Sequence, residues 1–192
     1  MKKLLFGFFA TILLTFTVNA QGTLRANFLK GKTYEEIKTT YIALEKRDKL
    51  NLWNEKFVQI LSQKIDDNIR INVELLQKEF NNENLDTEIV KKIALNLTEE
   101  MSEEQFEDMF MKLDDYTAKI YTQNMVYDGI KAQINEKSMD FNSYVIVIEA
   151  GKKIPCNCEW TCSDFCDRPT RNCKMTSSGC GFMWAFECTQ AC

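Results

Sequence analysis

The residues of this chain best suited to chemistry are its eight cysteines, which all lie in the last 37 of its 192 residues. They are Cys156, Cys158, Cys162, Cys166, Cys173, Cys180, Cys188 and Cys192. A segment of this size usually buries too little apolar surface to fold alone, so we expect it to need cross-links or a metal ion. The preceding residues contain no cysteine, and this contrast divides the chain into a body and a cysteine-rich tail.

Three kinds of chemistry compete for these thiols. A redox-active pair typically has two residues between its cysteines, and no neighbouring pair here has that spacing. Zinc sites favour short knuckles in two separated pairs, ideally with His, which the chain lacks. An even number of cysteines in an exported segment is better explained by disulfides. We therefore expect all eight cysteines to form four disulfides of undetermined connectivity, with no metal and no cofactor.

The N-terminal residues explain why these cysteines could be oxidised. A short basic start precedes an uncharged, mostly apolar stretch at 4–18, and small residues follow it. This pattern predicts a signal peptide at 1–20, cleaved between Ala20 and Gln21. A spanning helix needs about 20 apolar residues, and Asn19 ends this run too early. We expect a soluble product, secreted or periplasmic, with no stable membrane span after signal removal.

Charge and composition weaken or exclude several function classes. The formal net charge is −4, and it becomes −6 when the predicted signal leaves with its two lysines. Phosphate contacts require clustered Lys and Arg, so we expect no nucleic-acid partner. The absence of His removes Ser-His and Cys-His nucleophiles, the imidazole base and His metal ligands. We expect no catalytic residue, and an exported thiol or metal enzyme remains as a third hypothesis.

The periodicity of the body, residues 21–154, is helical. Capping-box patterns at Thr33 and Ser102 each predict the start of a helix. Apolar residues recur at three- and four-residue steps in four stretches, which are 34–44, 53–80, 85–97 and 106–125. The second stretch is either one helix or two that break near 66–68, and Asp128-Gly129 interrupts or ends the last one. A β-branched run at 144–148 predicts a short strand.

Local patterns also predict two elements in the tail, residues 155–192. Cysteines four residues apart at 158–166 indicate a short helix. Small and polar residues at 176–181 are turn material, and alternation at 182–188 has the period of a strand. The predicted fold class is therefore mainly α: a small helical bundle followed by a disulfide-rich C-terminal mini-domain with a short helix and a short strand.

Large rings give the tail a candidate contact surface. Most of them are expected to fill the space around the cystines, yet so small a domain cannot hide every ring. The candidate target-binding residues are Trp160, Phe165, Phe182, Trp184 and Phe186. Between body and tail, Gly151, Lys152 and Lys153 form either a processing site or a solvated linker.

Three elements of the tail carry a family resemblance. They are Cys156-Asn157-Cys158, Ser163-Asp164-Phe165-Cys166 and Gly179-Cys180-Gly181-Phe182-Met183-Trp184. With these elements the tail, about 37 of 192 residues, resembles the fulvocin C-related bacteriocin family. The resemblance implies an antibacterial peptide closed by four disulfides, with the preceding region as a precursor part.

Two functional hypotheses follow from these observations. In the first, the chain is an exported bacteriocin-like precursor whose helical body is a pro-region and whose cystine-rich tail binds a target on competing bacteria. In the alternative, it is an exported binding or adhesion protein whose disulfide-rich recognition module stays uncleaved. Both predict an unknown protein or cell-surface partner and no catalysis.

Overall fold

A computed structural model describes residues 23–121, 126, 128–142, 145–146 and 175–189. The predicted signal peptide, its cleavage site at Ala20 and Gln21, the processing residues 151–153 and the predicted helix at 158–166 lie outside the described residues. The helices are α1 Leu24–Leu29, α2 Tyr34–Ile42, α3 Lys46–Leu61, α4 Asp67–Phe80, α5 Thr87–Glu100, α6 Glu103–Phe110 and α7 Asp128–Glu136. The remaining elements are β1 Val145–Ile146, β2 Met175–Cys180, a 3₁₀ turn η1 Phe182–Trp184, and β3 Phe186–Thr189. The described part is mainly helical, as the sequence predicts.

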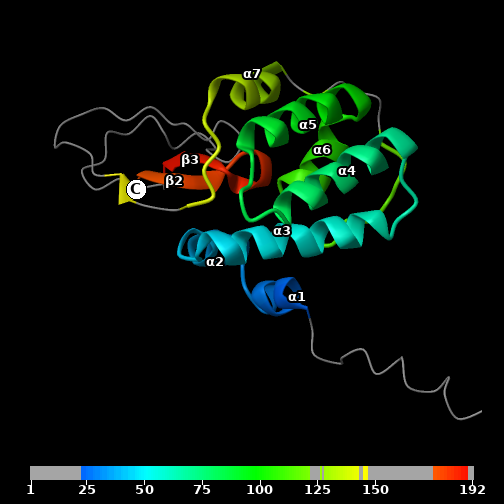
Figure 1. Cartoon of the computed structure of the whole chain (residues 1–192). Coiled ribbons are helices and arrows are strands. Elements are labelled where there is room, and N and C mark those ends of the chain that lie inside the picture. Colours follow the sequence, from blue (N-terminus) through cyan, green and yellow to red (C-terminus); the bar gives the residue numbers. More distant parts are fainter. Residues whose placement is uncertain (1–22, 122–125, 127, 143–144, 147–174, 190–192) are drawn as a thin grey trace, which may run out of the picture.

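The helices pack mostly on their neighbours in sequence. α3 packs on α4, and α4 on α5, while α1 lies against α3 and α7 against α5. Figure 1 shows β2 and β3, in orange and red, at one end of these helices, with α2 beside them. The helices α3, α4, α5 and α6 each bury an apolar stripe, which for α4 consists of Ile69, Val73, Leu76 and Phe80.

Local sequence signals fix where several helices begin. At Thr33 the capping box is complete, because the Thr33 hydroxyl accepts the Glu36 N–H and the Glu36 carboxylate accepts the Thr33 N–H. Ser102 caps α6 by accepting the N–H of Gln105 at 3.3 Å. Both predicted helix starts are confirmed.

The long apolar stripe at 53–80 belongs to two helices. α3 ends at Leu61 and α4 begins at Asp67, with Asp66 as its N-cap. The Arg70 guanidinium donates to the carbonyls of Leu61 at 2.9 Å and Gln63 at 3.0 Å. Because these carbonyls at the end of α3 are satisfied by a side chain, the chain can turn here without burying unpaired groups.

The prediction of a helix through 106–125 is wrong at 111–121, and residues 122–125 lie outside the described residues. Side chains from other elements capture the carbonyls that would have continued α6. Trp184 donates to the carbonyl of Met111, Arg25 to that of Leu113, Lys56 to that of Asp114, and Gln59 to that of Tyr116. We call residues 111–116 the captured segment. Asp128 begins α7 rather than ending a helix, which corrects the prediction at Asp128-Gly129.

The strands form one antiparallel sheet in the order β1-β2-β3. The strand predicted at 144–148 is confirmed at Val145–Ile146. The turn predicted at 176–181 is wrong, because most of that stretch is β2. The strand predicted at 182–188 is confirmed only from Phe186 onward, since 182–184 form the 3₁₀ turn. Pairing with β1 and β3 overrides the local preference of small polar residues for a turn.

The described tail residues share the core of the body. Residues 182–186 belong to the same buried cluster as the apolar stripes of the helices. We call Gly181–Phe186 the core turn. The described part of the tail thus does not build a separate core, and its apolar residues complete the core of the helices.

Candidate functional site

The structure describes the side chain of one predicted disulfide cysteine. Cys180 ends β2, is fully buried and is disulfide-bonded. Its partner is not among the residues whose side chains the structure describes. Cys188 lies in β3, and the other six cysteines lie outside the described residues. The expectation of four disulfides therefore stays a prediction for the rest of the tail.

Three of the five predicted target-binding residues are not at the surface. Phe182, Trp184 and Phe186 are at most 1% exposed. They cannot contact a partner in this conformation, so their assignment as an exposed recognition surface is corrected. The physical reason is that the helices cover the rings that a separate small domain would have left exposed. Trp160 and Phe165 lie outside the described residues.

The residues that enclose the core turn come from four parts of the body. We call them the receiving site, which consists of Tyr41, Trp53, Phe106, Phe110 and Met111. The Phe182 ring stacks on Phe106 with a centroid distance of 5.5 Å and lies 5.6 Å from Phe110. Trp184 meets Tyr41 and Trp53 edge to face, at 4.8 and 6.0 Å. Aromatic pairs in these arrangements stabilise a core beyond the area that they bury.

A chain of hydrogen bonds joins the receiving site to the core turn. The Trp53 indole N–H donates to the Tyr41 oxygen at 3.1 Å, and the Tyr41 hydroxyl donates to the Met183 carbonyl at 3.3 Å. The Trp184 indole N–H donates to the Met111 carbonyl at 2.8 Å. Burial raises the pKa of Tyr41 above its usual range, so this hydroxyl keeps its proton and remains a donor.

The backbone of the core turn is strained. Met183 and Trp184 have φ of 49° and 53°, the left-handed region that L-residues avoid. Gly181 has φ of 69° and ψ of −152°. A Cβ at Gly181 would lie 2.5 Å from the Phe186 ring and 2.6 Å from the Gln133 side chain. Such a conformation persists only where the surroundings impose it, and here the helices do so.

Charged residues lie next to the core turn. Lys38 donates to the Gly179 carbonyl, and its ammonium lies 4.5 Å from the Trp184 ring centroid. The Asp140 N–H donates to the Ala185 carbonyl at 2.7 Å. Lys49 is fully buried, and burial lowers its pKa to about 8 although the Asp140 carboxylate opposes this shift. The contacts of Lys38 and Asp140 hold the turn in place.

The strand register brings the two ends of the cysteine-rich stretch together. Val145 pairs with Thr176, and Ile146 pairs with Met175. The chain therefore leaves the sheet after Ile146 and returns to it at Met175, the residue with which Ile146 pairs. We call residues 147–174 the cysteine-rich insert, which includes Cys156, Cys158, Cys162, Cys166, Cys173, Trp160 and Phe165. Its structure lies outside the described residues, but both of its attachment points are described.

A second polar cluster lies beneath α1. The Glu55 carboxylate accepts the N–H groups of Leu24 and Arg25, and buried Arg25 forms an ion pair with Asp115. Lys56 is fully buried beside this pair, where burial first and the Arg25 charge second lower its pKa to about 7. Because its ammonium donates to the Asp114 carbonyl, Lys56 has a structural role in holding the captured segment.

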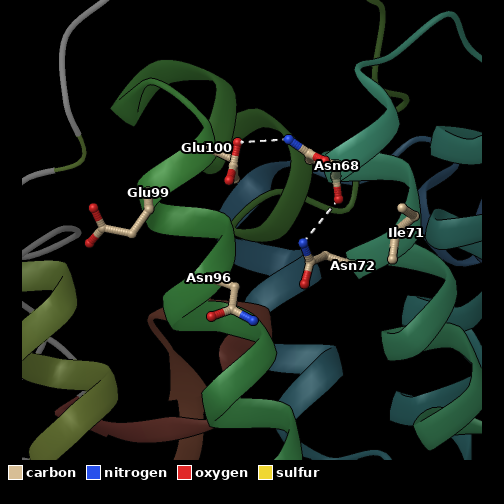
Figure 2. A pocket seen from close by; sticks show the side chains of 6 residues that line it. All are labelled: Asn68, Ile71, Asn72, Asn96, Glu99 and Glu100. Atoms are coloured by element: carbon tan, nitrogen blue, oxygen red, sulfur yellow. Dashed lines mark hydrogen bonds between the residues drawn. The ribbon is translucent and has the colours of Figure 1, made fainter.

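A shallow hollow of about 260 Å³ lies between α4 and α5 (Figure 2). Asn68, Ile71 and Asn72 line it from α4, and Asn96, Glu99 and Glu100 line it from α5. Asn72 donates to the Asn68 carbonyl at 2.9 Å, and the Asn68 amide donates to Glu100 at 3.4 Å. Glu99 accepts a hydrogen bond from Lys131 at 2.8 Å, and the lining brings no nucleophile next to a base.

Within the described residues, no cluster of three or more His, Cys, Asp or Glu side chains could hold a metal ion. The same part of the chain contains no helix long and apolar enough to cross a membrane. The functional residues that sequence reasoning missed are those of the receiving site. Their spacing marks them only as core positions, because nothing in a helical stripe shows that its partner lies more than 70 residues away in the tail.

No family model matches this chain, and neither the curated proteins nor the solved structures contain a match to it.

Proposed function

We propose that this chain is an exported recognition protein whose helical body holds the cysteine-rich insert by both ends and presents it to a target on a cell surface. The observation that carries this proposal is the attachment of the insert. One end is fixed through β1, and the other continues through β2 into the buried core turn. Because β1 and β2 fix the two attachment points side by side on one framework, these points need no ordering when a target binds, which lowers the entropy cost of binding.

The burial of the core turn favours an uncleaved protein over a released peptide. Cleavage at 151–153 would cut the chain but would not break the contacts of Phe182, Trp184 and Phe186 with the helices. Freeing the tail would expose these rings to water, at a cost of roughly 1.5–3 kcal/mol for each large side chain. We therefore favour the hypothesis in which the recognition module remains part of the body.

A bacteriocin-like activity is the second candidate. Its support is the resemblance of the tail to the fulvocin C-related family, especially through Gly179-Cys180-Gly181-Phe182-Met183-Trp184. In this chain that element includes most of the core turn. If the protein inhibits other bacteria, we propose that it does so with its tail still bound to the body.

Export and a binding role without catalysis are both part of the proposal. The signal-peptide pattern at 1–20 supports export, and the disulfide at Cys180 agrees with an oxidising compartment. The absence of His in the full sequence supports a binding role, because the commonest general base is missing. The net charge supports a protein or uncharged surface as the target, rather than nucleic acid.

The test compares binding of purified, oxidised variants to a panel of bacterial cells and isolated envelope material. The double variant Trp160→Ser/Phe165→Ser changes the insert and keeps every cysteine. We expect it to lose binding at least about tenfold, the usual effect of truncating a buried aromatic anchor at an interface. The matched control is Ile71→Ser/Ile89→Ser, which changes two exposed apolar residues of the body. Equal binding by the insert variant and loss of binding by the body variant would contradict the proposal.

A further inference from the structure

The cysteine-free body depends on a residue next to a disulfide. Cys180 directly precedes the core turn, is fully buried and is disulfide-bonded. The core turn contributes Phe182, Met183, Trp184 and Phe186 to the core that the helices share. The oxidation state of a tail cysteine is therefore linked, through this packing, to helices that contain no sulfhydryl group.

The core turn needs an external constraint to stay in its place. Two successive residues, Met183 and Trp184, lie in the left-handed region, and Gly181 has a backbone conformation that other residues avoid. A reduced tail gains conformational freedom when it leaves the core, whereas a cross-linked tail gains much less. The disulfide thus reduces the entropy that opposes docking of the strained turn.

The body in turn needs the core turn. Without Trp184, the rings of Tyr41 and Trp53 lose their edge-to-face partner, and the Met111 carbonyl loses its donor. Without Met183, the buried Tyr41 hydroxyl loses its acceptor. Buried polar groups left without partners and a cavity in the core both destabilise the folded state.

We propose that oxidation of Cys180 controls the folding of the helical body, so that the chain reaches its native packing only after the thiol has been oxidised. The Cys180 thiol and the thiol of a second tail cysteine each lose a proton and an electron as the S–S bond forms. An external disulfide, such as glutathione disulfide or the disulfide of an exchange protein, accepts the two electrons and two protons and becomes two thiols. The reducing interior of a cell would then hold the chain in a loosely packed state, and an oxidising compartment would complete the fold.

The experiment follows thermal unfolding of the full mature chain by far-UV circular dichroism, which reports the helices of the body. We expect reductant to lower the midpoint of this helical transition by about 5–15 °C. Because the body contains no cysteine, reductant cannot act on it directly. A helical transition that is the same with and without reductant would overturn the proposal.

Two variants show whether the effect passes through the core turn. Cys180→Ser should melt without reductant at about the temperature of the reduced wild-type chain, and a midpoint equal to that of the oxidised chain would overturn the proposal. In Trp184→Ala the docking contact is weakened, so reductant should shift the midpoint by less than about half of the wild-type shift. An undiminished shift would also overturn it. The oxidised wild-type protein binds or fails to bind cells independently of these results, so this inference and the proposed function can fail separately.

Discussion

α4 and the core turn both contribute to the same buried core, but they are built in opposite ways. The sequence of α4 itself favours a helix. Asp66 accepts the Asn68 N–H at its start, Lys78 lies in its last turn, and an apolar stripe faces inward. The core turn has two residues in an unfavourable conformation and depends on groups far away in the chain for its hydrogen bonds. One region would retain a helical preference if isolated, whereas the other has its shape only inside the body.

The captured segment, residues 111–116, shows the same dependence within the body. Its carbonyls accept hydrogen bonds from α1, α3 and the core turn rather than from their own helix. The conformation of the main chain there is determined by hydrogen-bond donors of other elements. Regions held by their own sequence should therefore tolerate single changes that the core turn and the captured segment do not.

The largest effect is expected when the central ring of the core turn is removed. Trp184→Ala should lower the free energy of unfolding by about 3–5 kcal/mol, because it leaves a cavity and an unpaired Met111 carbonyl. The matched control is Val58→Ala on the exposed side of α3, which should change it by less than about 0.5 kcal/mol. Urea denaturation of both variants measures these values, and similar losses for the two would remove the distinction between them.

The next effect compares two glycines that have the same φ of 69°. Gly181→Ala should destabilise the protein by about 2–4 kcal/mol, because strain and overlap with Phe186 and Gln133 add together. A Cβ at Gly31 meets nothing within 4 Å, so Gly31→Ala should cost only about 1–2 kcal/mol for the left-handed backbone. Thermal unfolding of the two alanine variants measures the difference. Equal midpoints would show that the crowding at Gly181 does not contribute to the loss of stability.

The buried lysines predict a rise in stability with pH. The pKa of Lys56 is lowered from its ordinary 10.5 to about 7 in the folded protein. Between these values the unfolded chain binds more protons than the folded one, so raising the pH through this interval favours folding. The free energy of unfolding should rise by about 1–3 kcal/mol between pH 7 and about pH 9, with a smaller contribution from Lys49.

Two variants assign this pH dependence. Lys56→Met should remove more than half of the rise, because methionine fills the same space without a titrating group. Lys46→Met changes an exposed lysine of the same helix and should leave the rise intact. Chemical denaturation at several pH values provides the comparison, and an unchanged rise in Lys56→Met would refute the assignment.

The smallest effect concerns a helix held by its own sequence. Asp86 caps α5 by accepting the N–H groups of Glu88 and Ile89 at 2.9 and 3.2 Å. Asp86→Ala should cost about 1 kcal/mol, and Asp86→Asn should restore most of it, because asparagine caps almost as well. Failure of Asn to restore stability would mean that charge, rather than the cap hydrogen bonds, matters there.

Sequence reasoning succeeded where local chemistry decides the structure. The starts of α2 and α6 follow from Thr33 and Ser102, and the strand at Val145–Ile146 follows from its β-branched residues. It failed at residues 111–121, where an apolar stripe continues but side chains from elsewhere donate to carbonyls of the captured segment. It also failed for β2, since small polar residues form a strand only because β1 and β3 lie beside them.

The candidate site also combines features that follow from local sequence with features that depend on distant residues. The four disulfides and the signal peptide at 1–20 follow from spacing and composition and stay predictions, because most of their residues lie outside the described part of the chain. The burial of Phe182, Trp184 and Phe186 depends on residues such as Tyr41 and Trp53, more than 120 positions earlier in the chain. A pattern confined to the tail cannot reveal a partner so distant in sequence, so the tail alone predicts that some of these rings form a contact surface.

The most direct test of the account cuts the chain inside the cysteine-rich insert. A recognition sequence for a specific protease replaces Gly151-Lys152-Lys153, and the cleaved, oxidised protein is analysed by native size exclusion and mass spectrometry. Since the body has no cysteine, no disulfide can join it to the tail. We predict that body and tail elute together and separate only in denaturant. A tail that elutes alone, while the body keeps its helical spectrum and thermal midpoint, would contradict the claim that the core turn is part of the body.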